Sequence, residues 1–211
     1  EDPRFVERAE QMFGEDVFAI GPCSVMRFVN QGTKWHPDTV NINQSGVSFL
    51  FYLQPVRSDR GALRVIPGSH MNPWHDELRE VRAKQKLGGE HPIKRALGGV
   101  AHIPAYACEA DPGDAVAFDV RLWHASWGGG SERKMCSVGY FAAPTSEDDE
   151  AVIRERAEQE ASLIEAFPLV RRPAHWIANP DNNPIRAKWI GFLRENGFTG
   201  FEQTGTTNEH E

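Results

Sequence analysis

The chain has 211 residues, of which 40% are hydrophobic and 25% charged, and its formal net charge is −7. This length fits one domain with a sizeable core. The acidic balance argues against nucleic acid as a partner, because a phosphate-binding surface needs clustered Lys and Arg. No apolar stretch approaches the roughly 18 residues of a membrane span. Three cysteines without metal-ligand spacing indicate neither a disulfide framework nor a zinc site, so we expect a reducing, cytoplasmic location.

The first predicted element is a short amphipathic helix that begins at Pro3 and ends near Phe13. Asp2 is a typical N-cap before a proline in the first turn, and Gly14 is a typical stop. The sequence leaves open a missing N-terminal segment, because it opens with Glu1 rather than Met.

From Val17 to Ala142 the pattern changes to short apolar runs separated by Gly, Pro, Asn and Asp. Such spacing is typical of an antiparallel sandwich or barrel, so we predict a mainly β fold of this kind. The predicted strands are Val17–Ile20, Val25–Val29, Val47–Leu53, Leu63–Ile66, Ala115–Val120 and Ser137–Phe141.

The segment from Pro73 to Tyr106 is polar and Gly-rich, with one expected helix from Trp74 to Lys86. Long insertions inside a compact domain are usually lids or binding loops, so residues 73–106 are a candidate lid. Residues 57–95 hold nine Lys and Arg against five Asp and Glu. A basic lid would favour an anionic small-molecule substrate; the alternative is that these side chains simply face water.

Two further helices are predicted near the C-terminus. The first runs from Ser146 to Phe167, with Ser146 and Asp149 in capping-box positions, and the second follows Pro184 and stops at Gly197. We expect both to pack on the sheet. The predicted organisation is a single domain over 1–211, with a core at 17–144 and a C-terminal helical region at 146–197.

His36-Pro37-Asp38 is the first stretch that carries chemistry. On a strand, side chains at i and i+2 leave the same face, so His36 and Asp38 can present an imidazole and a carboxylate to one metal ion. Pro37 lacks an N–H, which suits an edge or bulged position. His75-Asp76-Glu77 competes, but its surroundings indicate a helix, where residues i and i+2 diverge, and we reject it.

The second such stretch begins at Gly113 and ends in Trp123-His124-Ala125-Ser126. A Gly-rich loop follows and predicts a hairpin, which would bring Arg133 back beside the strand that carries His124 and Ser126. Two His and one carboxylate match the facial triad of non-haem Fe(II) oxygenases. Arg133 suits the far carboxylate of a dicarboxylate co-substrate, because its planar fork pairs with a carboxylate bidentately; Arg121 is the fallback.

Together with the run Gly61-Ala62-Leu63-Arg64-Val65-Ile66-Pro67-Gly68-Ser69-His70, these motifs resemble the phytanoyl-CoA dioxygenase family, in order from about Val17 to Pro144. The resemblance implies a double-stranded β-helix (a jelly-roll, cupin-like fold) with flanking α-helices. It implies that Fe(II) is the cofactor and that 2-oxoglutarate and O2 are co-substrates. It makes His36, Asp38 and His124 the iron ligands, assigns the 2-oxoglutarate tail to Arg133 with help from Ser126, and gives His70 a structural role.

The resemblance thus predicts an enzyme that oxidises a C–H bond of a small molecule and releases succinate and CO2. Asp38 favours hydroxylation over halogenation, because halogenating relatives carry a small residue there and leave room for a halide. Two alternatives stay open: a cupin-type metal enzyme that does not use 2-oxoglutarate, and a non-catalytic jelly-roll binding module. None of these features indicates an oligomeric state.

Overall fold

The computed structural model describes residues 1–14, 16–28, 32–79, 103–129, 133–166 and 171–202. The chain divides into two compact units, Cys23–Gly139 and the combination of Glu1–Pro22 with Tyr140–Glu211. Strand β9 (Arg133–Ala142) begins in the first unit and ends in the second. Each unit is described by itself below, and the single domain over 1–211 stays a prediction.

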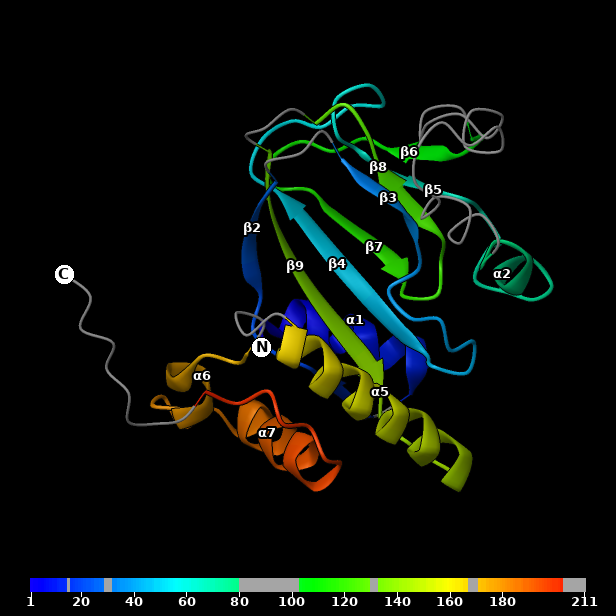
Figure 1. Cartoon of the computed structure of the whole chain (residues 1–211). Coiled ribbons are helices and arrows are strands. Elements are labelled where there is room, and N and C mark those ends of the chain that lie inside the picture. The colour runs from blue at the N-terminus through cyan, green and yellow to red at the C-terminus, as the bar shows by residue number, and fades with distance from the viewer. Residues whose placement is uncertain (15, 29–31, 80–102, 130–132, 167–170, 203–211) are drawn as a thin grey trace. The chain divides into compact units, whose positions relative to one another are not determined.

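The unit Cys23–Gly139 is built from two antiparallel sheets, which Figure 1 shows as two groups of arrows. In the first sheet, β2 pairs with β9, β9 lies beside β4, and β4 pairs with β7. The second sheet has the order β3-β8-β5-β6. The bounds are β2 (Ser24–Phe28), β4 (Gly46–Tyr52) and β7 (Ala115–Asp119), then β3 (Thr33–His36), β8 (His124–Ser126), β5 (Leu63–Val65) and β6 (Tyr106–Cys108).

The core of this unit lies between the two sheets. Leu50 and Tyr52 of β4 form one buried cluster with Leu63 and Val65 of β5, which belongs to the other sheet. Alternation along β4 places Ser48 on the same face as Leu50 and Tyr52. Two facing antiparallel sheets around one core are the jelly-roll arrangement, so the predicted fold class is confirmed.

The second unit combines helices with the end of β9. It contains α1 (Pro3–Phe13), β1 (Val17–Ala19), α5 (Glu147–Ala166), α6 (Ala174–Ala178) and α7 (Pro184–Glu195). β1 pairs with residues 140–142 of β9, and the indole of Trp189 donates to the carbonyl of Val17 at 2.9 Å. α7 is thereby fixed to the short strand pair.

The helix ends follow the predicted caps. The Asp2 carboxylate accepts the backbone N–H of Arg4 at 3.0 Å, and α1 ends at Gly14. At the start of α5, the Ser146 hydroxyl accepts the backbone N–H of Asp149 at 3.2 Å, which confirms the capping box. Local side-chain chemistry therefore fixes where these helices begin.

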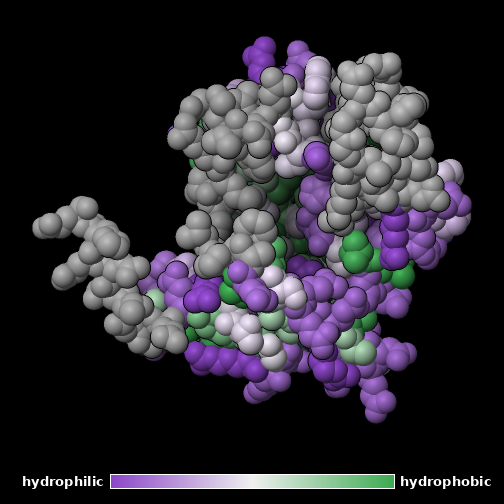
Figure 2. All heavy atoms as spheres, viewed as in Figure 1, coloured by the Kyte–Doolittle hydropathy of each residue, from purple (hydrophilic) through white to green (hydrophobic). Residues whose placement is uncertain are grey.

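The long helix α5 has a strongly acidic first turn of Glu147, Asp148, Asp149 and Glu150. The visible surface over the helices at the bottom of Figure 2 is mainly purple, that is, hydrophilic. On the buried side, Ile153, Ala157 and Ile164 contribute to the core. The acidic face is thus exposed to water, as an amphipathic helix requires. No helix in the described part of the chain is long and apolar enough to cross a membrane.

Helix α2 (Trp74–Glu77) is short. The predicted helix from Trp74 to Lys86 continues into residues 80–102, which lie outside the described part of the chain. Most of the candidate lid at 73–106 lies there too, so the lid stays a prediction.

Candidate active site

Strand pairing brings the two predicted histidine ligands together. His36 of β3 lies directly opposite His124 of β8, and their ring centroids are 4.4 Å apart. Thr33 lies opposite Ser126, so the three-residue step from Thr33 to His36 on β3 matches a two-residue step on β8. This irregularity is a β-bulge, which turns Thr33 and His36 toward the same side although they are three residues apart.

Asp38 follows immediately after β3, in a bend rather than within a strand. Its backbone N–H donates to the carbonyl of Val120 at 2.8 Å, and its Oδ1 lies 3.5 Å from Nε2 of His124. Pro37 lies just after β3, which is the end strand of its sheet in the described part of the chain, so the missing N–H costs no ladder bond, as the sequence predicts. His36 and Asp38 still face the same side, although the strand ends between them.

Both imidazoles have a defined orientation. Nδ1 of His36 lies 2.6 Å from the carbonyl oxygen of Lys34, and Nδ1 of His124 lies 2.9 Å from that of Leu122. A carbonyl only accepts hydrogen bonds, so each Nδ1 carries the proton and each Nε2 has its lone pair available. Burial lowers the pKa of His124, although Asp38 opposes this effect, and the lowered pKa favours the neutral ring that a metal ligand requires.

These three side chains fit a metal ion. One potential ligand atom each from His36, Asp38 and His124 lies within 4.8 Å of the others, the only such group of His, Cys, Asp or Glu among the described residues. Two imidazole nitrogens and one carboxylate on one side suit iron and leave positions open for other ligands. The carbonyl bonds at Nδ1 are the outer-shell partners usual for metal-binding histidines.

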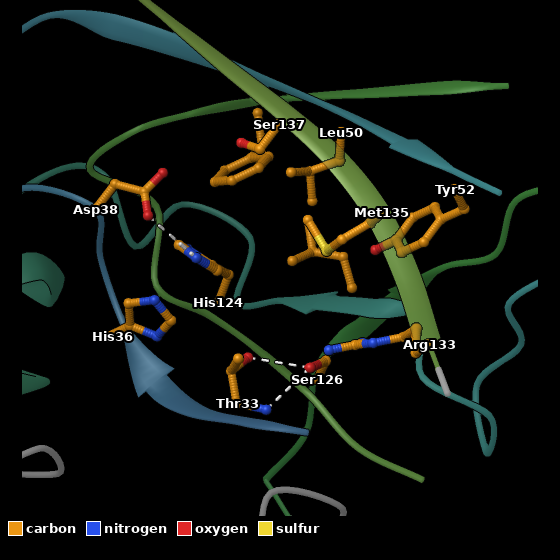
Figure 3. A pocket seen from close by; sticks show the side chains of 12 residues that line it. Thr33, His36, Asp38, Leu50, Tyr52, His124, Ser126, Arg133, Met135 and Ser137 are labelled. Carbon is orange, nitrogen blue, oxygen red and sulfur yellow. Dashed lines mark hydrogen bonds and ion pairs between the residues drawn. The ribbon is translucent and has the colours of Figure 1, made fainter. Parts of the chain in front are cut away.

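A cavity of about 210 Å³ extends from this cluster and lies entirely within the unit Cys23–Gly139. In Figure 3, His36, Asp38 and His124 lie on one side, and Arg133 reaches in from β9 toward Ser126. The cavity is small, which suits a small co-substrate. The lining residues are Thr33, His36, Asp38, Leu50, Tyr52, Leu63, Phe118, His124, Ser126, Arg133, Met135 and Ser137.

Arg133 is the cation of this cavity and is only 2% exposed. The predicted hairpin is wrong, because β8 and β9 belong to different sheets, and Arg133 lines the same cavity as Ser126 from the opposite sheet. Its Nη1 donates to the carbonyl of Gly61 at 2.5 Å. A Cβ on Gly61 would lie 2.9 Å from Cδ of Arg133, and one on Gly129 would lie 3.1 Å from it. The arginine side chain therefore packs directly against the backbone of both glycines. Burial lowers the pKa of Arg133, which means that an anion beside the guanidinium would be strongly favoured.

Ser126 and Tyr52 add hydroxyl groups to the cavity. The Ser126 hydroxyl accepts the backbone N–H of Thr33 at 3.0 Å and lies 3.0 Å from the Thr33 hydroxyl. Burial raises the pKa of Tyr52, so its phenol stays protonated, while the charge of Arg133 acts in the opposite direction. The cavity thus combines one buried cation with neutral hydroxyl groups, a set that suits a carboxylate.

The fallback Arg121 and the rejected His75 both lie outside this site. Arg121 pairs with Asp119, with Nη2 2.6 Å from Oδ2, and does not line the cavity. His75 is fully buried in α2 and is not part of the metal-ligand group. In the Pro-Gly-Ser-His run, Ser69 makes the hydrogen bond to the site segment. Its hydroxyl accepts the backbone N–H of Trp123, the residue before His124, at 2.9 Å.

The sequence analysis missed several polar residues at this site, among them Ser137, which lines the cavity. Thr33 and Tyr52 line the cavity, and the Ser48 hydroxyl donates to Oδ2 of Asp38 at 2.8 Å. A signal was present for Ser48: it is a single polar residue in the apolar run 47–52, at the alternate positions shared by Leu50 and Tyr52. Thr33 carries no such signal, because its orientation depends on the bulge.

Comparison with solved structures finds likeness at low sequence identity. EvdMO1 is 23% identical with a TM-score of 0.48, and the match covers 68% of this chain and 31% of that one. EvdO2 from Micromonospora carbonacea var. aurantiaca, complexed with 2-oxoglutarate, is 21% identical with a TM-score of 0.46 and coverages of 68% and 60%. The epimerase SnoN, in complex with Fe3+, alpha ketoglutarate and nogalamycin RO, is 21% identical with a TM-score of 0.47 and coverages of 67% and 56%. The chain thus spans less than two thirds of the length of each.

Among curated proteins, no sequence matches the chain significantly. A family model does match: Phytanoyl-CoA dioxygenase (PhyH), over residues 1–135. This range is more than half of the chain and includes all five predicted site residues, from His36 to Arg133. The chain therefore belongs to the phytanoyl-CoA dioxygenase family, whose cofactor is Fe(II) and whose co-substrates are 2-oxoglutarate and O2.

Proposed function

We propose that this chain is an oxygenase that hydroxylates a C–H bond of a small molecule, using Fe(II), 2-oxoglutarate and O2. The observation that supports this most directly is a shared cavity: the His36, Asp38 and His124 cluster and the buried Arg133 line the same space of about 210 Å³. A dicarboxylate can reach from metal ligands to a guanidinium only if both face one cavity.

In this proposal His36, Asp38 and His124 hold the iron. When bound, Fe(II) supplies the activation of O2, which couples decarboxylation of 2-oxoglutarate to succinate and CO2 with insertion of one oxygen atom into the C–H bond. Arg133 pairs with the far carboxylate of 2-oxoglutarate, and the Ser126 hydroxyl donates a hydrogen bond to the same group. The apolar neighbours Leu50, Phe118 and Met135 exclude water from the cavity.

The two alternatives are less well supported. A cupin-type enzyme without 2-oxoglutarate has no need for a buried arginine in the cavity that the metal ligands line. A non-catalytic module has no need for all three ligand positions, nor for the carbonyl bonds that orient both histidines. Hydroxylation is favoured over halogenation because Asp38 occupies the position that a halide would need.

The substrate class stays open within this proposal. The predicted anionic substrate rests on the local charge of residues 57–95, much of which lies outside the described part of the chain. Of the described arginines there, Arg57 pairs with Asp111 at 2.7 Å and Arg79 with Asp76 at 3.1 Å, both at the surface. These surface pairs favour the alternative that the two arginines simply face water. The cytoplasmic location also stays a prediction.

The test is spectroscopic and then chemical. Anaerobic addition of Fe(II) and 2-oxoglutarate should produce a weak visible charge-transfer band, and admission of O2 should convert 2-oxoglutarate to succinate. His36→Ala and Asp38→Ala should each abolish the band. His75→Ala is the matched control, because His75 lies outside the ligand group and its loss should leave the band intact. If wild type gives neither band nor succinate, the proposal fails.

A further inference from the structure

The carboxylate of Asp38 has two oxygens in different surroundings. Oδ1 lies 3.5 Å from Nε2 of His124, within the cluster of potential metal ligands. Oδ2 accepts a 2.8 Å hydrogen bond from the hydroxyl of Ser48. One oxygen is thus turned toward the metal-binding side chains, and the other is held by a neutral donor.

Ser48 is well placed to hold this orientation. It is 5% exposed and lies in the middle of β4, whereas Asp38 follows β3 in the opposite sheet. The bond therefore links the two sheets of the unit beside the cavity. A hydroxyl on a central strand has little freedom, and its hydrogen bond to Asp38 is partly buried, which makes it stronger than a fully exposed one.

We propose that Ser48 is a positioning residue that holds the Asp38 carboxylate with Oδ1 turned toward the metal. This inference rests on the proposed function, since it concerns the same site. Two imidazole nitrogens and one carboxylate oxygen occupy three of six positions and leave three, which is the number that 2-oxoglutarate and O2 need together. Without the Ser48 bond the carboxylate is free to turn, and Oδ1 is no longer held toward the metal.

The test measures metal affinity with Mn(II), a redox-stable probe whose unbound fraction is counted by electron paramagnetic resonance. Ser48→Ala should weaken Mn(II) binding about 10- to 100-fold, the usual effect of removing an outer-shell partner. Ser48→Thr keeps the hydroxyl and suits a strand, so it should restore affinity to near the wild-type value. If Ser48→Ala does not fold, Ser48→Cys replaces it, because a thiol is a weak donor of similar shape and should also weaken binding.

A matched control separates positioning from general damage to β4. Phe49 is the next residue, is buried, and leaves the opposite face of the sheet. Phe49→Leu should lower thermal stability while leaving Mn(II) affinity unchanged. Equal affinity of wild type and Ser48→Ala, or failure of Ser48→Thr to restore binding, would overturn the inference and leave the proposed function intact. Absence of Mn(II) binding by wild type would instead overturn both.

Discussion

Arg133 shows at the level of a single residue why this cavity suits a carboxylate. The side chain is almost completely buried, and burial lowers its pKa because the charged form loses water. A buried cation is costly unless a charge of opposite sign meets it. The hydroxyl groups of Tyr52 and Ser126 line the same cavity and can add hydrogen bonds to a carboxylate. An anion in the cavity would therefore meet both a buried guanidinium and hydroxyl donors.

Arg133→Lys should therefore weaken 2-oxoglutarate binding and leave metal binding unchanged. Lysine keeps the positive charge but cannot form two parallel hydrogen bonds with one carboxylate. One lost bond to a charged group amounts to about 1.5–3 kcal/mol, so affinity should fall roughly tenfold or more. Calorimetric titration of the Mn(II)-loaded protein with 2-oxoglutarate measures this effect.

Arg121→Lys is the control for this substitution. Arg121 also uses its fork on a carboxylate, that of Asp119, but it does not line the cavity. Its replacement should leave 2-oxoglutarate affinity at the wild-type value. Equal losses in both variants would mean that Arg133 does not contact the co-substrate.

At the level of elements, the turn before β5 fixes the place of Arg133. Gly61 has φ +80°, and a Cβ there would lie 2.8 Å from Cα of Gly129 and 2.9 Å from Cδ of Arg133. The first atom belongs to the backbone, which cannot rotate away. The turn containing Gly61 and the Gly-rich loop after β8 therefore touch only because neither glycine has a side chain.

Gly61→Ala should consequently destabilise the fold and also weaken 2-oxoglutarate binding. Gly68 provides a matched control, since its φ is also +80° but a Cβ there would meet nothing within 4 Å. Both variants carry the backbone strain of about 1–2 kcal/mol, and only Gly61→Ala adds the contact with Arg133. Urea unfolding and 2-oxoglutarate titration of both variants separate the two effects. If Gly68→Ala weakens 2-oxoglutarate binding as much, the close packing of Gly61 and Gly129 against Arg133 is not what orients this side chain.

Elements governed by local rules were predictable from the sequence. The caps Asp2 and Ser146 and the alternating apolar runs encode helix starts and strands within a few residues. The bulge between Thr33 and His36 was not predictable, because it exists only in the pairing of β3 with β8.

The same distinction applies to the candidate site. The pair His36 and Asp38 is visible as a local motif, but the contact with His124 joins residues 88 positions apart in the sequence. The match to a facial triad and the family resemblance indicated that contact in advance. Ser48 lies on a third strand, and its bond to Asp38 depends on how the two sheets face each other. Such contacts follow from tertiary packing and leave little local trace.

At the level of the whole molecule, the candidate site and the most buried described ion pair lie in different units. The candidate site lies within Cys23–Gly139, whereas a buried ion pair between Arg172 and Glu160 lies in the other unit. Arg172 Nη2 is 2.6 Å from Oε2 of Glu160, with side-chain exposures of 4% and 14%. The same guanidinium also donates to the carbonyls of Ile20 and Gly200. This arginine thus connects three separate segments of its unit.

Glu160→Ala should therefore lower the melting temperature without changing Mn(II) affinity. Removing one partner leaves a buried charge uncompensated, which typically costs about 3–5 kcal/mol, or roughly 6–20 °C for a chain of this size. Glu150 is the control on the same helix: it pairs with Arg154 at 3.3 Å, but both side chains are more than half exposed. Glu150→Ala should shift stability by less than about 0.5 kcal/mol. Thermal unfolding with and without Mn(II) measures both quantities. Loss of Mn(II) binding in Glu160→Ala would show that the metal site depends on the helical unit for its integrity.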